Sequence, residues 1–424
     1  MQLRKTQLVD WITLIIIVLL TALYAWTMME VPFHPDESTQ IYMSKDITSL
    51  FQNPLELTWG GSTPLPDEDR IRAIDAPLAK FLIGAVREIF SIPPLEADWN
   101  WGASWEENLN AGALPSQSQL LISRSIMTAL LPFSLWFFYL ALKKVLPPSA
   151  SLAATLLMGM NPLLLLHGRR AMSESVLIFG VGFFLWGITR DKRNPWLIGL
   201  AVAISINAKH SALGLLPAAL LAVILLPGEA PNPRRAGLNI LKTALVLSTI
   251  TILLNPFYWK DPLGALRTGA QARFKLAGEQ KENHLERLGV EGSALKITIP
   301  GLLLNTYFSQ PQTEEVGNYL AYTEETRSTY LANPIHTWGR DPISGAILAA
   351  LTFAGMGFIL RGFSQRTPRE RNIFLLILLA TVGLGAFLAT LLPWQRYVLA
   401  VLPLTFFWIG AGLTPIFTFK KKAG

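Results

Sequence analysis

The stretch WITLIIIVLLTALYAWTMM occupies residues 11–29 and contains no charged side chain. A helix needs about 20 mostly apolar residues to cross the hydrocarbon core of a bilayer, so this stretch predicts a transmembrane helix. It ends at Glu30 and Val31 without the small residues of a signal-peptide cleavage site, which favours an uncleaved anchor. The chain is therefore expected to enter a membrane close to its N-terminus.

Further apolar runs of similar length follow along the 424 residues. Overall 51% of the residues are hydrophobic and 15% are charged, against about a quarter charged in soluble domains. Together the runs predict an all-α integral membrane protein with about ten transmembrane helices in a single polytopic domain, residues 1–424. The runs after the first are 120–142, 151–166, 175–189, 196–208, 211–226, 238–254, 342–360, 373–392 and 397–415.

The charges orient this protein in the membrane. Ten spans place both termini on one side, and with a cytoplasmic N-terminus the inner segments carry seventeen Lys and Arg side chains against four acidic ones. This agrees with the positive-inside rule and predicts a multi-pass protein of the cytoplasmic membrane with both termini cytoplasmic. The net charge of +7 then reflects orientation, and no nucleic-acid partner is expected. The absence of cysteine excludes disulfides, thiolate nucleophiles and Cys-ligated zinc.

Two outer segments, residues 31–118 and 256–341, are long and hold 23 of the 29 acidic residues. Stretches 38–50, 76–90 and 295–308 are short and amphipathic, which is typical of helices lying on a membrane surface. We expect an extracytoplasmic active site, with catalysis in the first loop and substrate or acceptor contacts in the second.

The first outer segment opens with His34-Pro35-Asp36-Glu37, directly after the first span. Two adjacent carboxylates at the membrane surface suit acid–base or metal chemistry. Alternatively, one of them caps the following helix, since acidic residues favour helix N-termini. In the same segment Asp75 precedes the second amphipathic stretch.

Cationic side chains are expected at the outer ends of several spans, where an anionic group could bind. Arg is preferred where a planar, bidentate donor is needed, although such a side chain can also extend to ordinary lipid headgroups. The candidates are Arg124, Arg169, Arg170, Lys209 and Arg396, with Arg396 the strongest and His210 expected to be structural.

Glu174 lies near the interior of a span, where an ionisable group is functional by default unless it is paired. Its expected partner is Arg170, four residues earlier on the predicted helix. Trp99, Trp101 and Trp105 either stack on sugar faces or anchor the first outer loop at the membrane surface.

This layout resembles the GT-C superfamily of polyprenyl-phosphate-dependent membrane glycosyltransferases. It is most similar to the protein O-mannosyltransferases and their compact bacterial relatives, which include the lipid A aminoarabinose transferases. The most specific matches are the Asp36-Glu37 pair and residues 75–80, where the family has His-Pro-Pro-Leu-Gly-Lys and this chain has Asp75 and Ala76 before Pro77, and ends in Lys80. Weaker matches are Arg124, residues 167–174, 208–214 and 396–403.

The resemblance implies an inverting glycosyltransferase that moves a sugar from a polyprenyl-phosphate donor to a protein, lipid or glycan acceptor. Asp36 is the expected general base, and Glu37 either orients the acceptor or shares a divalent metal ion with Asp36 and Asp75. The residues expected to bind substrate are His34, Asp75, Lys80, Arg124, Arg169, Arg170, Glu174, Lys209, His210 and Arg396. The alternatives are a transporter or flippase for an anionic lipid-linked sugar, or a non-catalytic membrane assembly subunit.

Overall fold

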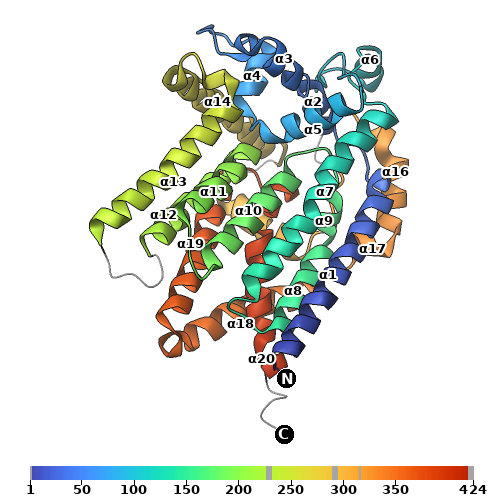
Figure 1. The fold of residues 1–424 in the computed structure, drawn as a ribbon. Helices are drawn as coiled ribbons and strands as arrows, with labels where there is room; N and C mark the ends of the chain where they lie inside the picture. Colours follow the sequence, from blue (N-terminus) through green and yellow to red (C-terminus); the bar gives the residue numbers. More distant parts are fainter. Residues whose placement is uncertain (1, 226–231, 289–294, 315–316, 419–424) are drawn as a thin grey trace.

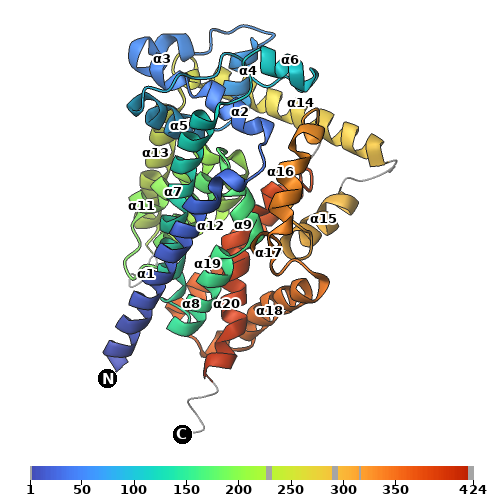
Figure 2. The same cartoon turned by 90° about the vertical axis from the view of Figure 1, so that its right-hand side faces the viewer.

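A computed structural model describes residues 2–225, 232–288, 295–314 and 317–418. Within these ranges the chain is helical and contains no β-strand, which confirms the all-α prediction. Figure 1 shows a bundle of long helices with shorter helices gathered at one end. The first turn of α1 and the last turn of α20 lie at the opposite end (Figures 1 and 2).

Among the described residues, five helices are long and apolar enough to cross a membrane, and five shorter helical segments are also apolar. These ten segments coincide with the ten predicted runs, so the chain is a membrane protein, while the number of spans stays a prediction. The long helices are α1 (Gln2–Thr27), α7 (Gln117–Leu142), α13 (Pro233–Leu254), α18 (Pro342–Arg361) and α19 (Pro368–Leu388). The shorter ones are α8 (Pro148–Gly159), α10 (Glu174–Thr189), α11 (Pro195–Ala208), η3 with α12 (His210–Leu215, Leu216–Ile224) and α20 (Leu402–Thr418).

Helix α10 lies in the centre of the bundle and packs against α7 and α11. A side chain at Gly180 would bring a Cβ within 2.4 Å of the Ser205 hydroxyl on α11, and one at Gly182 would lie 3.1 Å from the Ser134 carbonyl on α7. Small residues let helix backbones approach closely where lipid provides no hydrophobic driving force. The glycines of α10 therefore let it pack closely between α7 and α11, and the outer ends of α10 and α11 reach the site described below.

One predicted span is wrong in detail. The run 151–166 is divided, because α8 ends at Gly159 and α9 (Pro162–His167) begins after Asn161. Pro162 has no backbone N–H to continue the helix, and the Asn161 side chain accepts a hydrogen bond from the Leu163 N–H (3.0 Å), which starts a new one.

The two outer segments fold into the helices that cover the upper end and one flank of the bundle in Figure 2. Of the predicted amphipathic helices, 76–90 and 295–308 are present as α5 and α15, whereas 38–50 is divided at Ser44 into α2 and α3. The first segment forms α2 (Pro35–Met43), α3 (Asp46–Gln52), α4 (Asp67–Ile74), α5 (Leu78–Ile89) and α6 (Trp105–Asn110). The second forms α14 (Pro262–Leu288), α15 (Leu295–Tyr307), α16 (Leu320–Ala332) and α17 (Pro334–Thr337). Helix α14 lies over the same end of the bundle as α2 to α5, and α15 to α17 run along its flank (Figure 2).

Candidate active site

A cavity of about 1540 Å³ lies between the outer helices and the bundle. Its walls come from α2, α4, the loop 96–102, α14, α15, the outer ends of α10 and α11, and the segment 392–397. Pockets for single small molecules usually measure about 300–1,000 Å³, so this cavity has room for two substrates.

The first turn of α2 sets the direction of the two adjacent carboxylates. His34 caps the helix: its Nδ1 accepts from the Asp36 N–H (3.1 Å), and the Glu37 carboxylate accepts from the His34 N–H (3.1 Å). Because successive helical residues point about 100° apart, the two acids face different surroundings. Asp36 lines the cavity with 32% of its side chain exposed, whereas the Glu37 side chain is fully buried.

Glu37 is held by Arg124 of α7 in a two-pronged ion pair with N···O distances of 2.8 and 2.7 Å. The Glu37 carboxylate also accepts from the Ala171 N–H (2.8 Å), and the Arg124 guanidinium donates to the carbonyls of Met28 (3.0 Å) and Val31 (2.8 Å). The capping alternative considered above thus applies to Glu37. Its carboxylate fixes α2 to the bundle and does not face the cavity.

Asp36 forms an ion pair with the guanidinium of Arg396. Arg396 belongs to the 3-10 helix η6 (Gln395–Ala400), and its guanidinium lies 4.9 Å from the ring centre of Trp394 and 5.7 Å from that of Tyr397. Burial opposes ionisation of Asp36, but the Arg396 charge prevails and lowers the pKa of Asp36 to about 2.

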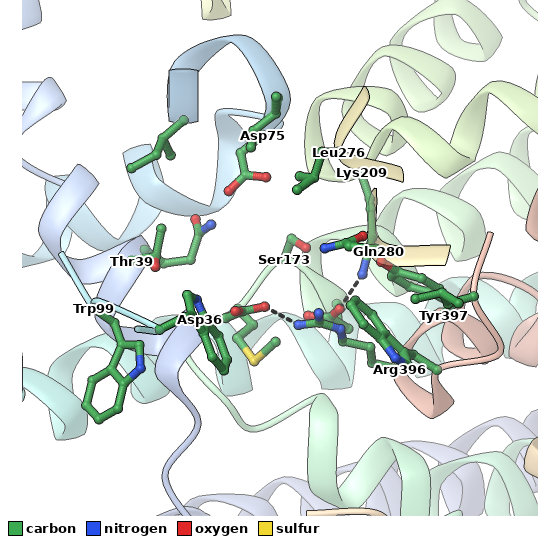
Figure 3. A pocket seen from close by; sticks show the side chains of 18 of the residues that line it. Asp36, Thr39, Asp75, Trp99, Ser173, Lys209, Leu276, Gln280, Arg396 and Tyr397 are labelled. Atoms are coloured by element: carbon green, nitrogen blue, oxygen red, sulfur yellow. Dashed lines mark hydrogen bonds and ion pairs between the residues drawn. The ribbon is translucent and has the colours of Figure 1, made fainter. Parts of the chain in front are cut away.

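A second cation, Lys209, also lies close to the Tyr397 ring. Lys209 Nζ is 4.7 Å from the centre of the Tyr397 ring and 2.5 Å from Glu174 Oε1 (Figure 3 shows Lys209, Tyr397 and Arg396 together). The predicted ion pair of Glu174 with Arg170 is therefore wrong, because Glu174 pairs with Lys209. Glu174 is the first residue of α10 and Arg170 precedes that helix, so the spacing of a helical turn does not apply.

No protein-family model matches this chain, and no curated protein matches it. Solved structures do. The oligosaccharyltransferase AglB of Archaeoglobus fulgidus, in complex with an inhibitory peptide and a dolichol-phosphate, matches 98% of the chain with a TM-score of 0.51 and 14% identity. The A. fulgidus oligosaccharyltransferase in complex with Zn and sulfate matches 96% with a TM-score of 0.50 and 14% identity. The chain has the GT-C fold.

This chain spans about half the length of those archaeal enzymes, since the matches cover 51% and 50% of their chains. The S. cerevisiae O-mannosyltransferase Pmt1-Pmt2 complex bound to its sugar donor matches 59% of this chain with a TM-score of 0.39 and 12% identity, so the fold assignment rests on the archaeal structures. The fold expected from the resemblance to the GT-C superfamily is confirmed, and membership of a particular family stays a prediction.

The GT-C fold brings half of the sequence-predicted site residues to the cavity. Those that line it are Asp36, Asp75, Glu174, Lys209, His210 and Arg396. Those that do not are His34, Glu37, Lys80, Arg124, Arg169 and Arg170. The cations of the second group bind protein groups: besides Arg124 with Glu37, Lys80 Nζ is 2.6 Å from Asp46 of α3.

Arg169 and Arg170, both predicted to bind substrate, are at least 99% buried. The Arg170 guanidinium donates to the carbonyls of Pro32 (3.2 Å) and Thr313 (2.5 Å), and that of Arg169 donates to the Thr27 hydroxyl and to the Tyr330 hydroxyl (3.3 Å). Each ties the segment before α10 to neighbouring elements. They therefore support the cavity from outside its walls.

Several lining residues were not singled out from the sequence, and three of them carry groups that bear on the site. Arg273 projects from α14, and Thr39 and Asp98 come from α2 and the loop 96–102. Burial raises the pKa of the Asp75 carboxyl; Arg273 opposes the rise and Asp36 adds to it. The sequence signal that could have drawn attention to Arg273 is its charge, since it is a cation of the long second outer segment.

The predicted metal site at Asp36 and Asp75 is not supported by the donor set. The described residues contain no group of three or more His, Cys, Asp or Glu side chains placed to hold a metal ion, and the Asp36 carboxylate already accepts from Arg396. A Mg²⁺ ion at a phosphate site is usually held by one or two carboxylates together with the substrate, and here the pairing of Asp36 with Arg396 competes with that role. No step proposed below passes through a metal ion.

Proposed function

We propose that this chain is an inverting glycosyltransferase that moves a sugar from a polyprenyl phosphate to an acceptor at the outer face of the cytoplasmic membrane. The observation that carries the proposal is the pairing, in one large cavity, of an accessible carboxylate with two cations held on an aromatic ring. The archaeal GT-C structures lend support, since one holds a dolichol-phosphate together with a peptide.

In the proposed reaction an acceptor oxygen or nitrogen attacks the anomeric carbon of the donor. The bond from that carbon to the phosphate oxygen breaks, polyprenyl phosphate leaves with the electron pair, and the acceptor proton passes to Asp36. Attack from the face opposite the phosphate inverts the anomeric configuration without a covalent intermediate. A positioned base of this kind contributes about 10²- to 10⁴-fold in rate.

The negative charge that develops on the phosphate requires donors at the other end of the reacting bond. Arg396 offers a planar guanidinium for phosphate oxygens, and Lys209 adds a point charge beside the same Tyr397 ring. Glu174 holds the Lys209 ammonium at 2.5 Å, which fixes its position at the cavity wall.

Arg396 has a second role in this proposal, because its charge makes Asp36 a weak base in the free protein. A base works best when its pKa is near the operating pH, and that of Asp36 is about 2. A phosphate that binds Arg396 neutralises this charge, and burial then raises the pKa of Asp36. Binding of the donor therefore activates the base.

This coupling predicts different pH profiles for two kinetic constants. The constant kcat/KM for the donor reports the protein without donor, where Asp36 is ionised down to about pH 2, so it stays flat from pH 7 to 4.5 as far as Asp36 is concerned. The constant kcat reports the donor complex and falls as the pH drops through the raised pKa. Initial rates at varied donor concentration, measured across this pH range, give both constants. A fall of kcat and of kcat/KM at the same pH would contradict the coupling.

Replacing Arg396 with Gln is expected to lower kcat/KM for the donor about 10- to 100-fold, since a hydrogen bond to a charged group contributes about 1.5–3 kcal/mol. The pH at which kcat/KM falls should also move up to the pH at which kcat falls, because no guanidinium lowers the pKa of Asp36 in this variant. Arg369→Gln is the control: this cation pairs with Asp191 at 2.7 Å, and neither residue lines the cavity. An equal kcat/KM for the donor in the two variants would show that Arg396 does not bind the donor phosphate.

The orientation proposed from the charges agrees with the placement of the cavity. The cavity lies at the end of the bundle opposite the first turn of α1 and the last turn of α20. With cytoplasmic termini it faces the outer side. Transporters place polar sites near the bilayer midplane between broken helices, so the terminal position of this cavity favours the enzyme over the flippase.

The direct test incubates the purified full-length protein in lipid nanodiscs with polyprenyl-phosphate sugars and measures released polyprenyl phosphate. Release with one donor class is expected, and it should stop when Asp36 is replaced. A parallel sample with EDTA tests the divalent ion, because loss of release on chelation would restore a metal to the site. Sugar-lipid movement across the bilayer without release would identify a flippase instead.

A further inference from the structure

The cavity has two chemically different halves, with Asp36 between them. Figure 3 shows Lys209, Arg396 and Tyr397 on one side of Asp36, and Thr39 and Trp99 on the other. The loop 96–102 continues this second side and adds Asp98 and Trp101 to the cavity lining. We call Thr39, Asp98, Trp99 and Trp101 the aromatic wall.

The two tryptophans of the aromatic wall differ in exposure. Trp99 is 3% exposed and donates from its indole N–H to the Asn318 side chain (3.1 Å), whereas Trp101 is 47% exposed and lines the cavity. The Trp101 ring lies 6.3 Å from the His34 ring and 6.1 Å from the Tyr319 ring, both at steep angles. Its indole is therefore held in place next to the turn that carries Asp36.

Asp98 lies beside this ring with one carboxylate oxygen available. Its Oδ1 accepts from the Thr39 hydroxyl (2.7 Å) and from the Trp99 backbone N–H (2.8 Å), which fixes the side chain. Within the described ranges both hydrogen bonds to the carboxylate go to Oδ1, which leaves Oδ2 for a ligand, and the side chain lines the cavity. A fixed acceptor and a fixed aromatic ring lose little conformational freedom on binding a ligand.

This pairing suits a sugar ring. The electron-rich face of an indole attracts the C–H groups on one face of a pyranose, and a carboxylate accepts hydrogen bonds from the hydroxyls at its rim. We propose that the aromatic wall is the acceptor subsite and binds an uncharged sugar ring, so that the acceptor is a glycan. The assignment to the acceptor, as opposed to sugar binding itself, rests on the proposed function.

The acidic side chains of this half disfavour anionic acceptors, although Arg70 and Arg273 also line the cavity. Asp75, Glu96 and Asp98 line the cavity, and within the described part of the chain none of them has a cation within 4 Å. A phosphorylated or uronic acid acceptor would meet like charges here, which disfavours binding. The donor phosphate instead meets Arg396 and Lys209 on the far side of Asp36.

Binding of methyl glycosides tests the subsite independently of catalysis. We would label the full-length protein with 5-fluorotryptophan, assign the Trp101 resonance with Trp101→Phe, and titrate methyl mannoside, glucoside and galactoside by ¹⁹F NMR. Neutral glycosides are expected to shift this resonance, and Trp101→Ala should weaken their binding, followed at other tryptophan resonances, about ten-fold. Trp338→Ala is the matched control, since Trp338 is 49% exposed and lies outside the cavity.

A second variant guards against a folding defect in Trp101→Ala. Asp98→Asn removes the charge and keeps the shape; it should weaken neutral glycosides several-fold and reduce the discrimination against methyl glucuronide. Unchanged sugar affinity in both variants would overturn the sugar site. Where the protein binds glycosides and also turns over, two results would overturn the acceptor assignment. One is a higher KM for the donor in Trp101→Ala or Asp98→Asn, and the other is efficient transfer to unglycosylated peptides that carry hydroxyl groups. Sugar binding that depends on Trp101 without any release of polyprenyl phosphate would contradict the enzyme and leave the sugar site.

Discussion

Replacing Asp36 with Asn is expected to lower sugar transfer by about 10²- to 10⁴-fold, the contribution of a positioned general base. The substitution keeps the size of the side chain and removes its ability to take the acceptor proton. Asp36 is about one third exposed and its neighbour Glu37 holds the helix, so the variant should fold and insert normally. Release of polyprenyl phosphate from a matched donor and acceptor measures the effect.

The control for this substitution is Asp67→Asn. Asp67 is 92% exposed on α4, at the rim of the same cavity, and pairs only weakly with Arg70 at 3.5 Å. The Asp67 variant should retain wild-type turnover. Full activity of Asp36→Asn would remove the base assignment, and full activity of both Asp36→Asn and Arg396→Gln is what a non-catalytic assembly subunit predicts.

Replacing Arg124 with Met is expected to cost about 3–5 kcal/mol of stability, because it leaves the buried Glu37 carboxylate without its cation. Arg124 and Glu37 are exposed by 2% and 0%, so water cannot replace the lost partner. The first turn of α2 should loosen as well, and small displacements of a catalytic group lower rates steeply. Thermal unfolding of the protein in detergent and the transfer rate give the two readouts.

Two further variants separate charge from packing. In Glu37→Gln combined with Arg124→Met no buried charge remains unpaired, so part of the lost stability should return while activity stays low. Lys144→Met removes a surface pair with Asp191, exposed by 37% and 67%, and should change stability by less than about 1 kcal/mol. A loss in Arg124→Met no larger than that of Lys144→Met would show that the buried pair does not hold α2.

The sequence predicted well those features that depend on composition along the chain. Apolar runs gave the helices of the bundle, and the distribution of charge placed Asp36, Lys209 and Arg396 at one end, where they share a cavity. Asp36 and Glu37 were treated as a pair, because adjacent letters carry no information on which side chain turns inward. That depends on the His34 cap and on Arg124, which is 87 residues away from Glu37.

Side-chain partners that come from different helices of the bundle could not be predicted as well from the sequence. Glu174 was assigned to the nearest cation in a presumed helix, but its partner Lys209 comes from the end of a different helix. Arg169 and Arg170 were predicted to bind a phosphate because they are cations at the outer end of a span, and the carbonyls and hydroxyls that accept their hydrogen bonds cannot be read from a sequence. The GT-C fold itself was recognisable from a few short motifs.

The junction of Glu37 with Arg124 has a consequence for how such a protein can diversify. The turn that carries Asp36 is secured to the bundle by the end of α1, by α7 and by the backbone before α10, through Glu37 and Arg124. The loop 96–102 adds the hydrogen bond from Thr39 to Asp98 and the ring contact of Trp101 with His34. Because the Glu37–Arg124 pair does not involve that loop, substitutions in residues 91–104 that keep the Asp98–Thr39 hydrogen bond leave the catalytic carboxylate in place. Selection for a new acceptor can act on that loop while the chemistry is inherited unchanged, and exchange of the loop between related chains is the natural way to engineer acceptor preference.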